Sequence, residues 1–104
     1  MAFADNLKQL PPVSHLAALQ LLDASGQIAA AIENKPGQAG SLAVYAALAD
    51  KHGSINASAA QEGLDIYAEH TVDARGTPGK HPNIDRLLKI IETGQGFTVK
   101  LIAS

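Results

Sequence analysis

Residues 16–32, LAALQLLDASGQIAAAI, decide the fold. Two short apolar runs, residues 16–22 and 27–32, flank a turn at Ser25-Gly26, which is typical of a β-hairpin. One face of the second run is expected to carry Ile28, Ala30 and Ile32. The alternative is one alanine-rich helix over residues 14–33. We favour the hairpin, because a glycine in the middle of such a helix would lower its stability.

Helical periodicity is found on both sides of this hairpin. Upstream, a short helix is expected near the N-terminus and should end at Pro11-Pro12; its apolar positions are Phe3, Leu7 and Leu10. Downstream, one helix is predicted over residues 41–52, ended by Gly53, and a second from Asn56 or Ser58 to about Asp73. The residues expected to face inward are Leu42, Tyr45, Leu48 and Ala49 in the first helix, and Ala60, Leu64, Tyr67 and Thr71 in the second.

The C-terminal third predicts a turn over residues 76–79, a helix that begins at Pro82, and a closing strand. The helix has an apolar stripe expected to pack against the sheet, formed by Ile84, Leu87, Leu88 and Ile91. The strand alternates apolar and polar residues from Phe97 to Leu101. The sequence therefore predicts one α+β domain over residues 1–104. It has two layers: a small three-stranded sheet, made of the N-terminal hairpin and the C-terminal strand, with helices on one face.

Composition excludes several classes of protein. Apolar residues make up 46% of the 104-residue chain, too many for a disordered, charge-dominated chain. A net charge of −2 and few aromatic residues argue against nucleic-acid binding, and no apolar run is long enough for a membrane span. The chain has no cysteine, which excludes disulfides, thiol nucleophiles and thiolate zinc sites and fits a reducing compartment. We therefore expect a cytoplasmic protein with no nucleic-acid or membrane partner.

The segment over residues 75–86, RGTPGKHPNIDR, is the richest candidate site. It places three basic residues and an amide beside the start of a helix, where free N–H groups and the helix dipole attract anions. The predicted ligand-binding residues are Arg75, Lys80, His81 and Asn83. In the alternative interpretation, Pro-Gly only makes a turn, His81 or Asn83 caps the helix, and Lys80 is solvated.

Two further patterns have both structural and functional interpretations. The acidic residues Glu62, Asp65, Glu69 and Asp73 recur at helical spacing, which is typical of a solvated helix face or of a surface for a basic partner, including the 75–86 segment itself. His70 lies between Glu69 and Asp73, but its spacing matches no zinc site, so we predict no metal. No cofactor is predicted either, because the loop over residues 35–41 has neither the Walker pattern nor G-x-G-x-x-G.

Three functions remain open on these residues. The first is a non-enzymatic binding module that uses the 75–86 segment for an anionic small ligand or an acidic partner peptide. The second is a small enzyme with His70 or His81 as the acid–base group and Lys80 as the charge stabiliser; a cavity that unites the three would favour it. The third is a homo-oligomer that pairs through the edge strands of its sheet.

The stretches LDIYAEH, residues 64–70, and PGKHPNIDRL, residues 78–87, carry a resemblance to known proteins. The chain resembles a family of small uncharacterised bacterial proteins of about this length, a domain of unknown function, and the similarity extends over most of the chain. The resemblance implies a small bacterial cytoplasmic protein. It implies no chemistry and no functional residue.

Overall fold

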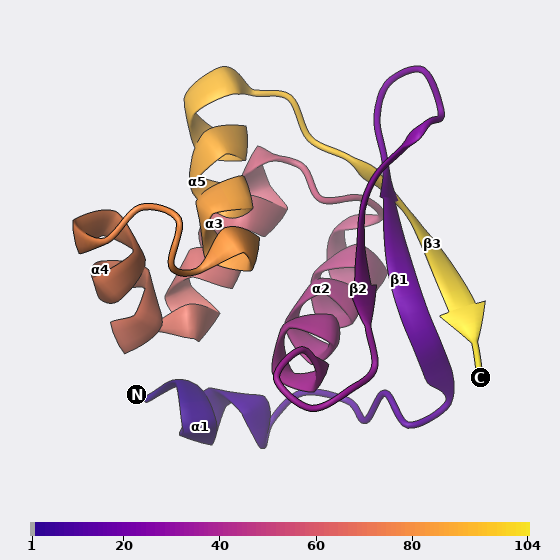
Figure 1. Cartoon of the computed structure of the whole chain (residues 1–104), viewed down its shortest axis with the longest axis horizontal. Helices are drawn as coiled ribbons and strands as arrows, with labels where there is room; N and C mark the ends of the chain where they lie inside the picture. Colours follow the sequence, from indigo (N-terminus) through magenta and orange to yellow (C-terminus); the bar gives the residue numbers. More distant parts are fainter. Residues whose placement is uncertain (1) are drawn as a thin grey trace.

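The computed structural model describes residues 2–104 and has an α+β architecture, as the sequence predicts. Within these residues, a three-stranded antiparallel sheet of order β2-β1-β3 has five helices on one of its sides (Figure 1). In chain order the elements are α1 (Phe3–Leu7), β1 (Leu16–Leu22), β2 (Ile28–Glu33), α2 (Ala39–His52), α3 (Ala57–Tyr67), α4 (Glu69–Gly76), α5 (Pro82–Thr93) and β3 (Thr98–Ala103). No helix in this part of the chain is long and apolar enough to cross a membrane.

The predicted hairpin is confirmed, and the alternative of a continuous helix is excluded. Strands β1 and β2 pair antiparallel with Leu19 opposite Ile32. The N–H of Asp23 donates to the carbonyl of Gln27 at 2.9 Å, and Gly26 has a φ of +86°, a conformation that favours glycine. The expectation that Ile28 shares the buried face of Ile32 is wrong. Ile28 is 59% exposed, because the register shifts beside the turn, between Leu21 and Leu22.

The closing strand β3 pairs antiparallel with the other edge of β1, so β1 is the central strand. Just before β3, Phe97 forms an isolated antiparallel bridge to Ile55 in the α2–α3 connection. The Ile55 N–H donates to the Phe97 carbonyl at 2.8 Å, and the Phe97 N–H donates to the Ile55 carbonyl at 3.1 Å. This bridge ties the start of β3 to the beginning of α3, where the Asn56 side chain accepts from the Ala59 N–H and caps the helix.

The helices form successive layers beside the sheet. Helix α2 packs on β1 and β2, α3 packs on α2, and α5 packs on α3 (Figure 1). The buried side of α5 therefore differs from the predicted stripe. Its buried residues are Ile84, Leu87 and Ile90, whereas Ile91 is 42% exposed and Leu88 is half-buried. The helix turns positions 84, 87 and 90 toward α3 instead of turning the predicted stripe toward the sheet.

The long helix predicted to reach Asp73 is interrupted at Ala68, so the structure has two helices, α3 and α4. The predicted inward residues Ala60, Leu64, Tyr67 and Thr71 are nevertheless all buried. Contacts with α1 hold the interruption: the Asn6 side chain donates to the Ile66 carbonyl at 2.9 Å, and the Phe3 N–H donates to the Glu69 carboxylate at 2.8 Å. An alanine at position 68 gives no sign of a break, because alanine is the best helix former.

Replacement of Ala68 by glycine is expected to stabilise the protein by about 0.5–1 kcal/mol. Ala68 has φ 51° and ψ −115°, a left-handed conformation that strains a residue with a Cβ. Urea unfolding measures the change. The matched control is Ala43→Gly in the middle of α2, which should lose about 1 kcal/mol because glycine weakens a helix interior. An equal loss in both variants would show that residue 68 is an ordinary helical position.

Candidate functional site

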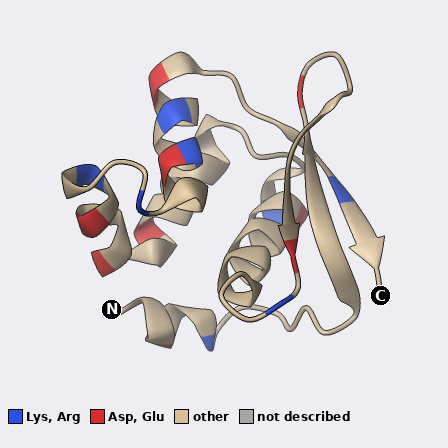
Figure 2. Ribbon diagram, in the orientation of Figure 1, with Lys and Arg blue, Asp and Glu red and all other residues tan. Residues whose placement is uncertain are grey.

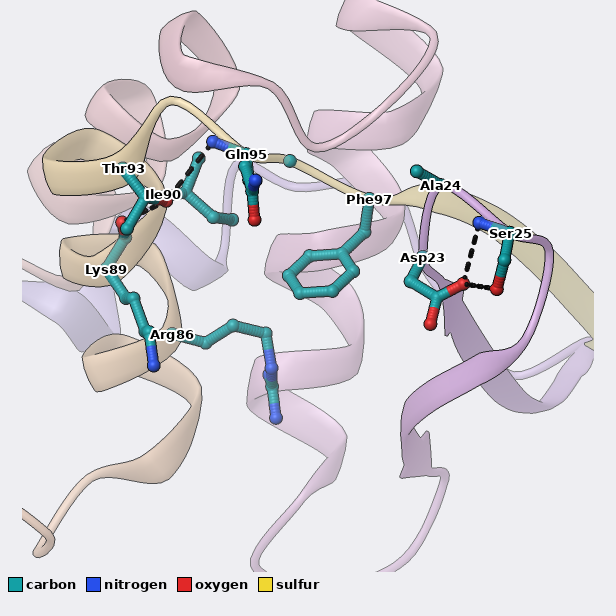
Figure 3. Close-up of a pocket in the computed structure, with 10 residues that line it drawn as sticks. Asp23, Ala24, Ser25, Arg86, Lys89, Ile90, Thr93, Gln95 and Phe97 are labelled. Atoms are coloured by element: carbon teal, nitrogen blue, oxygen red, sulfur yellow. Dashed lines mark hydrogen bonds between the residues drawn. The ribbon is translucent and has the colours of Figure 1, made fainter.

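Two cavities adjoin the segment that the sequence singles out. The first, which we call the Arg86 cleft, has a volume of about 560 Å³ and lies between the hairpin turn, α5 and the α5–β3 connection (Figure 3). Its lining residues are Asp23, Ala24, Ser25, Arg86, Lys89, Ile90, Thr93, Gln95, Gly96 and Phe97. The second, which we call the histidine cavity, has a volume of about 250 Å³ and lies at the N-terminus of α5. Its lining residues are Phe3, Gly37, Ser41, Tyr67, His70, Lys80, His81, Pro82, Asn83 and Ile84.

Arg86 is held in a fixed position on α5. Its Nη1 donates to the Asn83 side-chain oxygen at 2.8 Å and to the Tyr45 hydroxyl at 3.2 Å. The guanidinium carbon lies 5.6 Å from the centre of the Tyr45 ring, within the range of a cation–π contact. Burial raises the pKa of Tyr45 to about 12, although the nearby Arg86 acts in the opposite direction, so the phenol stays neutral and keeps its proton. The arginine is therefore positioned by neutral groups.

In the part of the chain that the structure describes, the cations of the Arg86 cleft have no carboxylate partner. Within residues 2–104, Lys35, Lys51 and Lys80 each form an ion pair, whereas Arg86 and Lys89 form none. Figure 3 shows both side chains extending from α5 on the same side of the cleft. An unpaired, positioned guanidinium presents a planar fork of donors that suits a carboxylate or a phosphate.

The rest of the Arg86 cleft combines an apolar surface with one acidic group. Ile90 is buried and Phe97 is half-buried, and the Phe97 ring lies between Arg86 and the hairpin turn (Figure 3). Across the ring, Asp23 Oδ1 accepts from the Ser25 hydroxyl at 2.7 Å, the Ser25 N–H at 2.9 Å and the Gln27 N–H at 3.0 Å. The hydrogen bond from the Ser25 hydroxyl has the largest effect on the pKa of Asp23 and that from the Gln27 N–H the next largest. Both lower this pKa, so the carboxylate stays charged.

In the histidine cavity, Lys80 and His81 are already bound to Asp73. His81 Nε2 lies 2.7 Å from Asp73 Oδ2, and Lys80 Nζ lies 2.9 Å from the same oxygen. The hydrogen bond with His81 has the largest effect on the pKa of Asp73 and that from Lys80 the next largest. Both hold this pKa below its ordinary value. The 75–86 segment thus supplies the partners of Asp73, one member of the acidic series. Glu62 binds Lys51 and His52 instead, so the series does not act as one surface.

Aromatic and hydroxyl groups complete the histidine cavity. The His70 ring lies 5.7 Å from His81 and packs edge-on against Phe3 at 5.2 Å between ring centres. The Tyr67 hydroxyl donates to Ser41 Oγ at 2.7 Å, and burial raises the pKa of Tyr67 well above its usual range. The cavity brings together His70, Lys80 and His81, the three residues proposed for acid–base chemistry.

The N-terminus of α5 offers few free donors for an anion. Pro82 has no N–H, and the N–H groups of Ile84 and Asp85 both donate to the His81 carbonyl. The four predicted ligand residues do not converge either. Lys80, His81 and Asn83 line the histidine cavity, whereas Arg75 lies on α4 beside a separate depression with Val72 and Asp65.

The sequence did not single out Arg86 and Asp23 as site residues. The spacing of Asn83 and Arg86, three residues apart on one helix, is a signal that could have suggested their hydrogen bond. Nothing in the sequence indicates that the hairpin turn approaches α5. Figure 2 shows that charged residues are concentrated on α4 and α5 and are sparse on the sheet, so Asp23 is one of few carboxylates on that side.

The family model described as "Uncharacterized protein conserved in bacteria (DUF2322)" matches residues 3–101. No curated protein and no solved structure matches the chain. The family match covers nearly the whole chain, including both cavities, and it confirms the resemblance seen in the sequence. The chain therefore belongs to the DUF2322 family of bacterial proteins.

Proposed function

We propose that this protein is a small cytoplasmic binding module for an organic anion, which binds in the Arg86 cleft. The observation that carries the proposal is the positioned guanidinium of Arg86, which has no acidic partner among residues 2–104 and lines an apolar cavity of about 560 Å³. Cavities of this size are typical of small-molecule sites, in which a few polar groups orient a ligand whose body contacts apolar walls. Arg86 is also the last residue of the 75–86 segment. The proposed ligand therefore still binds to this segment, but at its C-terminal end and not at the start of the helix.

The charges of the two cavities favour the Arg86 cleft over the histidine cavity for an anion. A ligand in the histidine cavity would compete with Asp73 for Lys80 and His81, which lie 2.9 and 2.7 Å from that carboxylate. A ligand at Arg86 displaces no ion pair, and Lys89 adds a second positive charge one turn further along α5. The carboxylate of a ligand would accept from Arg86 while its apolar body packs on Phe97 and Ile90.

Arg86→Met is expected to weaken the binding of hexanoate about fivefold to twentyfold, because it removes a positioned, half-buried cation but keeps an apolar stem. Dissociation constants come from NMR titrations, which also show whether the variant retains its fold. Lys100→Met is the matched control: it removes one charge from an exposed lysine on β3 and should change the affinity less than about twofold. Equal affinities of the wild type and Arg86→Met would contradict the proposal.

The second candidate is an acid–base enzyme centred on the histidine cavity. The hydrogen bond between Asp73 and His81 favours it, because a carboxylate that binds one ring nitrogen fixes the orientation of the imidazole. His70 and the Tyr67–Ser41 hydroxyl pair line the same cavity. Hexanoate-induced shifts that are confined to residues 70–83 and are unaffected by Arg86→Met would favour this candidate over the binding module.

A further inference from the structure

Among residues 2–104, only one oxygen of the Asp23 carboxylate accepts hydrogen bonds from the protein. All three hydrogen bonds from Ser25 and Gln27 reach Oδ1. Within residues 2–104, Oδ2 accepts no hydrogen bond, and Asp23 forms no ion pair. The turn therefore fixes the position of a charged carboxylate while leaving half of its hydrogen-bonding capacity to a ligand.

Asp23 and Arg86 stand on opposite walls of the same cleft. Asp23 comes from the β1–β2 turn and Arg86 from α5, and the Phe97 ring lies between them (Figure 3). The order across the cleft is therefore cation, apolar ring, anion. A ligand that satisfies all three would carry a negative group, an apolar middle and a positive group in the same order.

From this order we infer that the ligand is an amphoteric amino carboxylate, with its carboxylate on Arg86, its aliphatic or aromatic spacer on Phe97 and its ammonium group on Asp23 Oδ2. The inference rests on the proposed function, because Arg86 must hold the carboxylate. It adds a role for Asp23 as the residue that selects ligands with a positive end. Lys89 and Arg86 would repel an amine that lacks the carboxylate, so a simple alkylamine should bind poorly.

The test compares acids that differ only in a terminal amine, at three spacer lengths. The probes are 4-aminobutanoate, 6-aminohexanoate and 8-aminooctanoate, each titrated beside butanoate, hexanoate or octanoate, with hexylamine as the amine alone. At the length that spans the cleft, the amino acid should bind about threefold to tenfold tighter than its plain acid, the gain expected of one half-exposed charged hydrogen bond.

Asp23→Asn provides the matched variant. An asparagine keeps an acceptor oxygen for Ser25 and Gln27 and is favoured in the same turn, but it has no charge. The variant should remove the advantage of the amino acid over its plain acid, and the plain acid should bind somewhat more tightly because the cleft loses a negative charge. An unchanged pattern of amide signals over residues 23–27 would show that the turn is intact.

The possible results separate the two proposals. Plain acids that bind through Arg86 without any gain from an amine, at all three lengths, would overturn the inference and leave the proposed function standing. A gain that persists in Asp23→Asn would also overturn the inference, because the ammonium group would then lie elsewhere. If no acid binds, or if Arg86→Met has no effect, the proposed function fails and the inference fails with it.

Discussion

Leu87→Ala is expected to lower the free energy of unfolding by about 2–5 kcal/mol, the range found for large-to-small changes in well-packed cores. Leu87 is fully buried on the α3-facing side of α5. A Cβ at Gly63 would lie 2.7 Å from Leu87 Cδ1 and 2.9 Å from Leu48 Cδ1, which shows how closely α3 approaches both side chains. The neighbours have little freedom to fill the lost volume, so a cavity should remain.

Ile91→Ala is the control for this experiment, because it lies on the same helix and Ile91 belongs to the stripe predicted from the sequence. Ile91 is 42% exposed, so its truncation should cost less than about 1 kcal/mol. Urea unfolding of both variants gives the comparison, provided that the unfolding free energy of each falls with urea concentration at the same slope. A larger loss for Ile91→Ala than for Leu87→Ala would mean that α5 presents its other side to the core.

Gly96→Ala is expected to destabilise the protein by about 2–4 kcal/mol, since even one methyl group overfills this site and disturbs two backbone hydrogen bonds. A Cβ at position 96 would lie 2.2 Å from the carbonyl oxygen of Ile55 and 3.0 Å from Asn56 Cα. Both neighbours are backbone atoms, so the chain itself must move. That movement would separate the Ile55–Phe97 bridge and shift Asn56, which caps α3.

Gly76→Ala is the matched control, because a Cβ at the end of α4 meets no atom within 4 Å and Gly76 has no positive φ. It should change the unfolding free energy by less than about 1 kcal/mol, in the stabilising direction. Thermal unfolding followed by circular dichroism compares the two variants. If Gly96→Ala matched Gly76→Ala, the approach between the α5–β3 connection and Ile55 would be looser than the structure indicates.

The elements governed by local patterns could be predicted from the sequence. The hairpin depends on two apolar runs around Ser25-Gly26, and the end of α2 depends on Gly53, whose φ is +80°. What depends on tertiary contacts could not be predicted. The stop at Ala68 is held by α1 and carries no local signal, and the side that α5 buries depends on the position of α3.

The candidate site was predictable only in part, for the same reason. The sequence could place cations beside the start of a helix, and Lys80, His81 and Asn83 do lie there. It offered the 75–86 segment as one possible partner of the acidic series, but it could not show that Asp73 is the member that binds Lys80 and His81, because the interruption at Ala68 redirects α4. Nor could it join Asp23 to Arg86, which are far apart in the chain and line one cleft only because the hairpin turn lies across from α5.

The most direct test of anion binding at Arg86 is an amide chemical-shift map of the wild-type protein titrated with hexanoate. The largest changes are expected on residues 23–25, 86–90 and 93–97, which belong to the hairpin turn, α5 and the α5–β3 connection and line the Arg86 cleft together. They should weaken in Arg86→Met and with added salt, which screens the attraction of exposed charges. Changes spread over the whole surface, or concentrated on residues 80–83 of the histidine cavity, would contradict the claim that Arg86 anchors an organic anion.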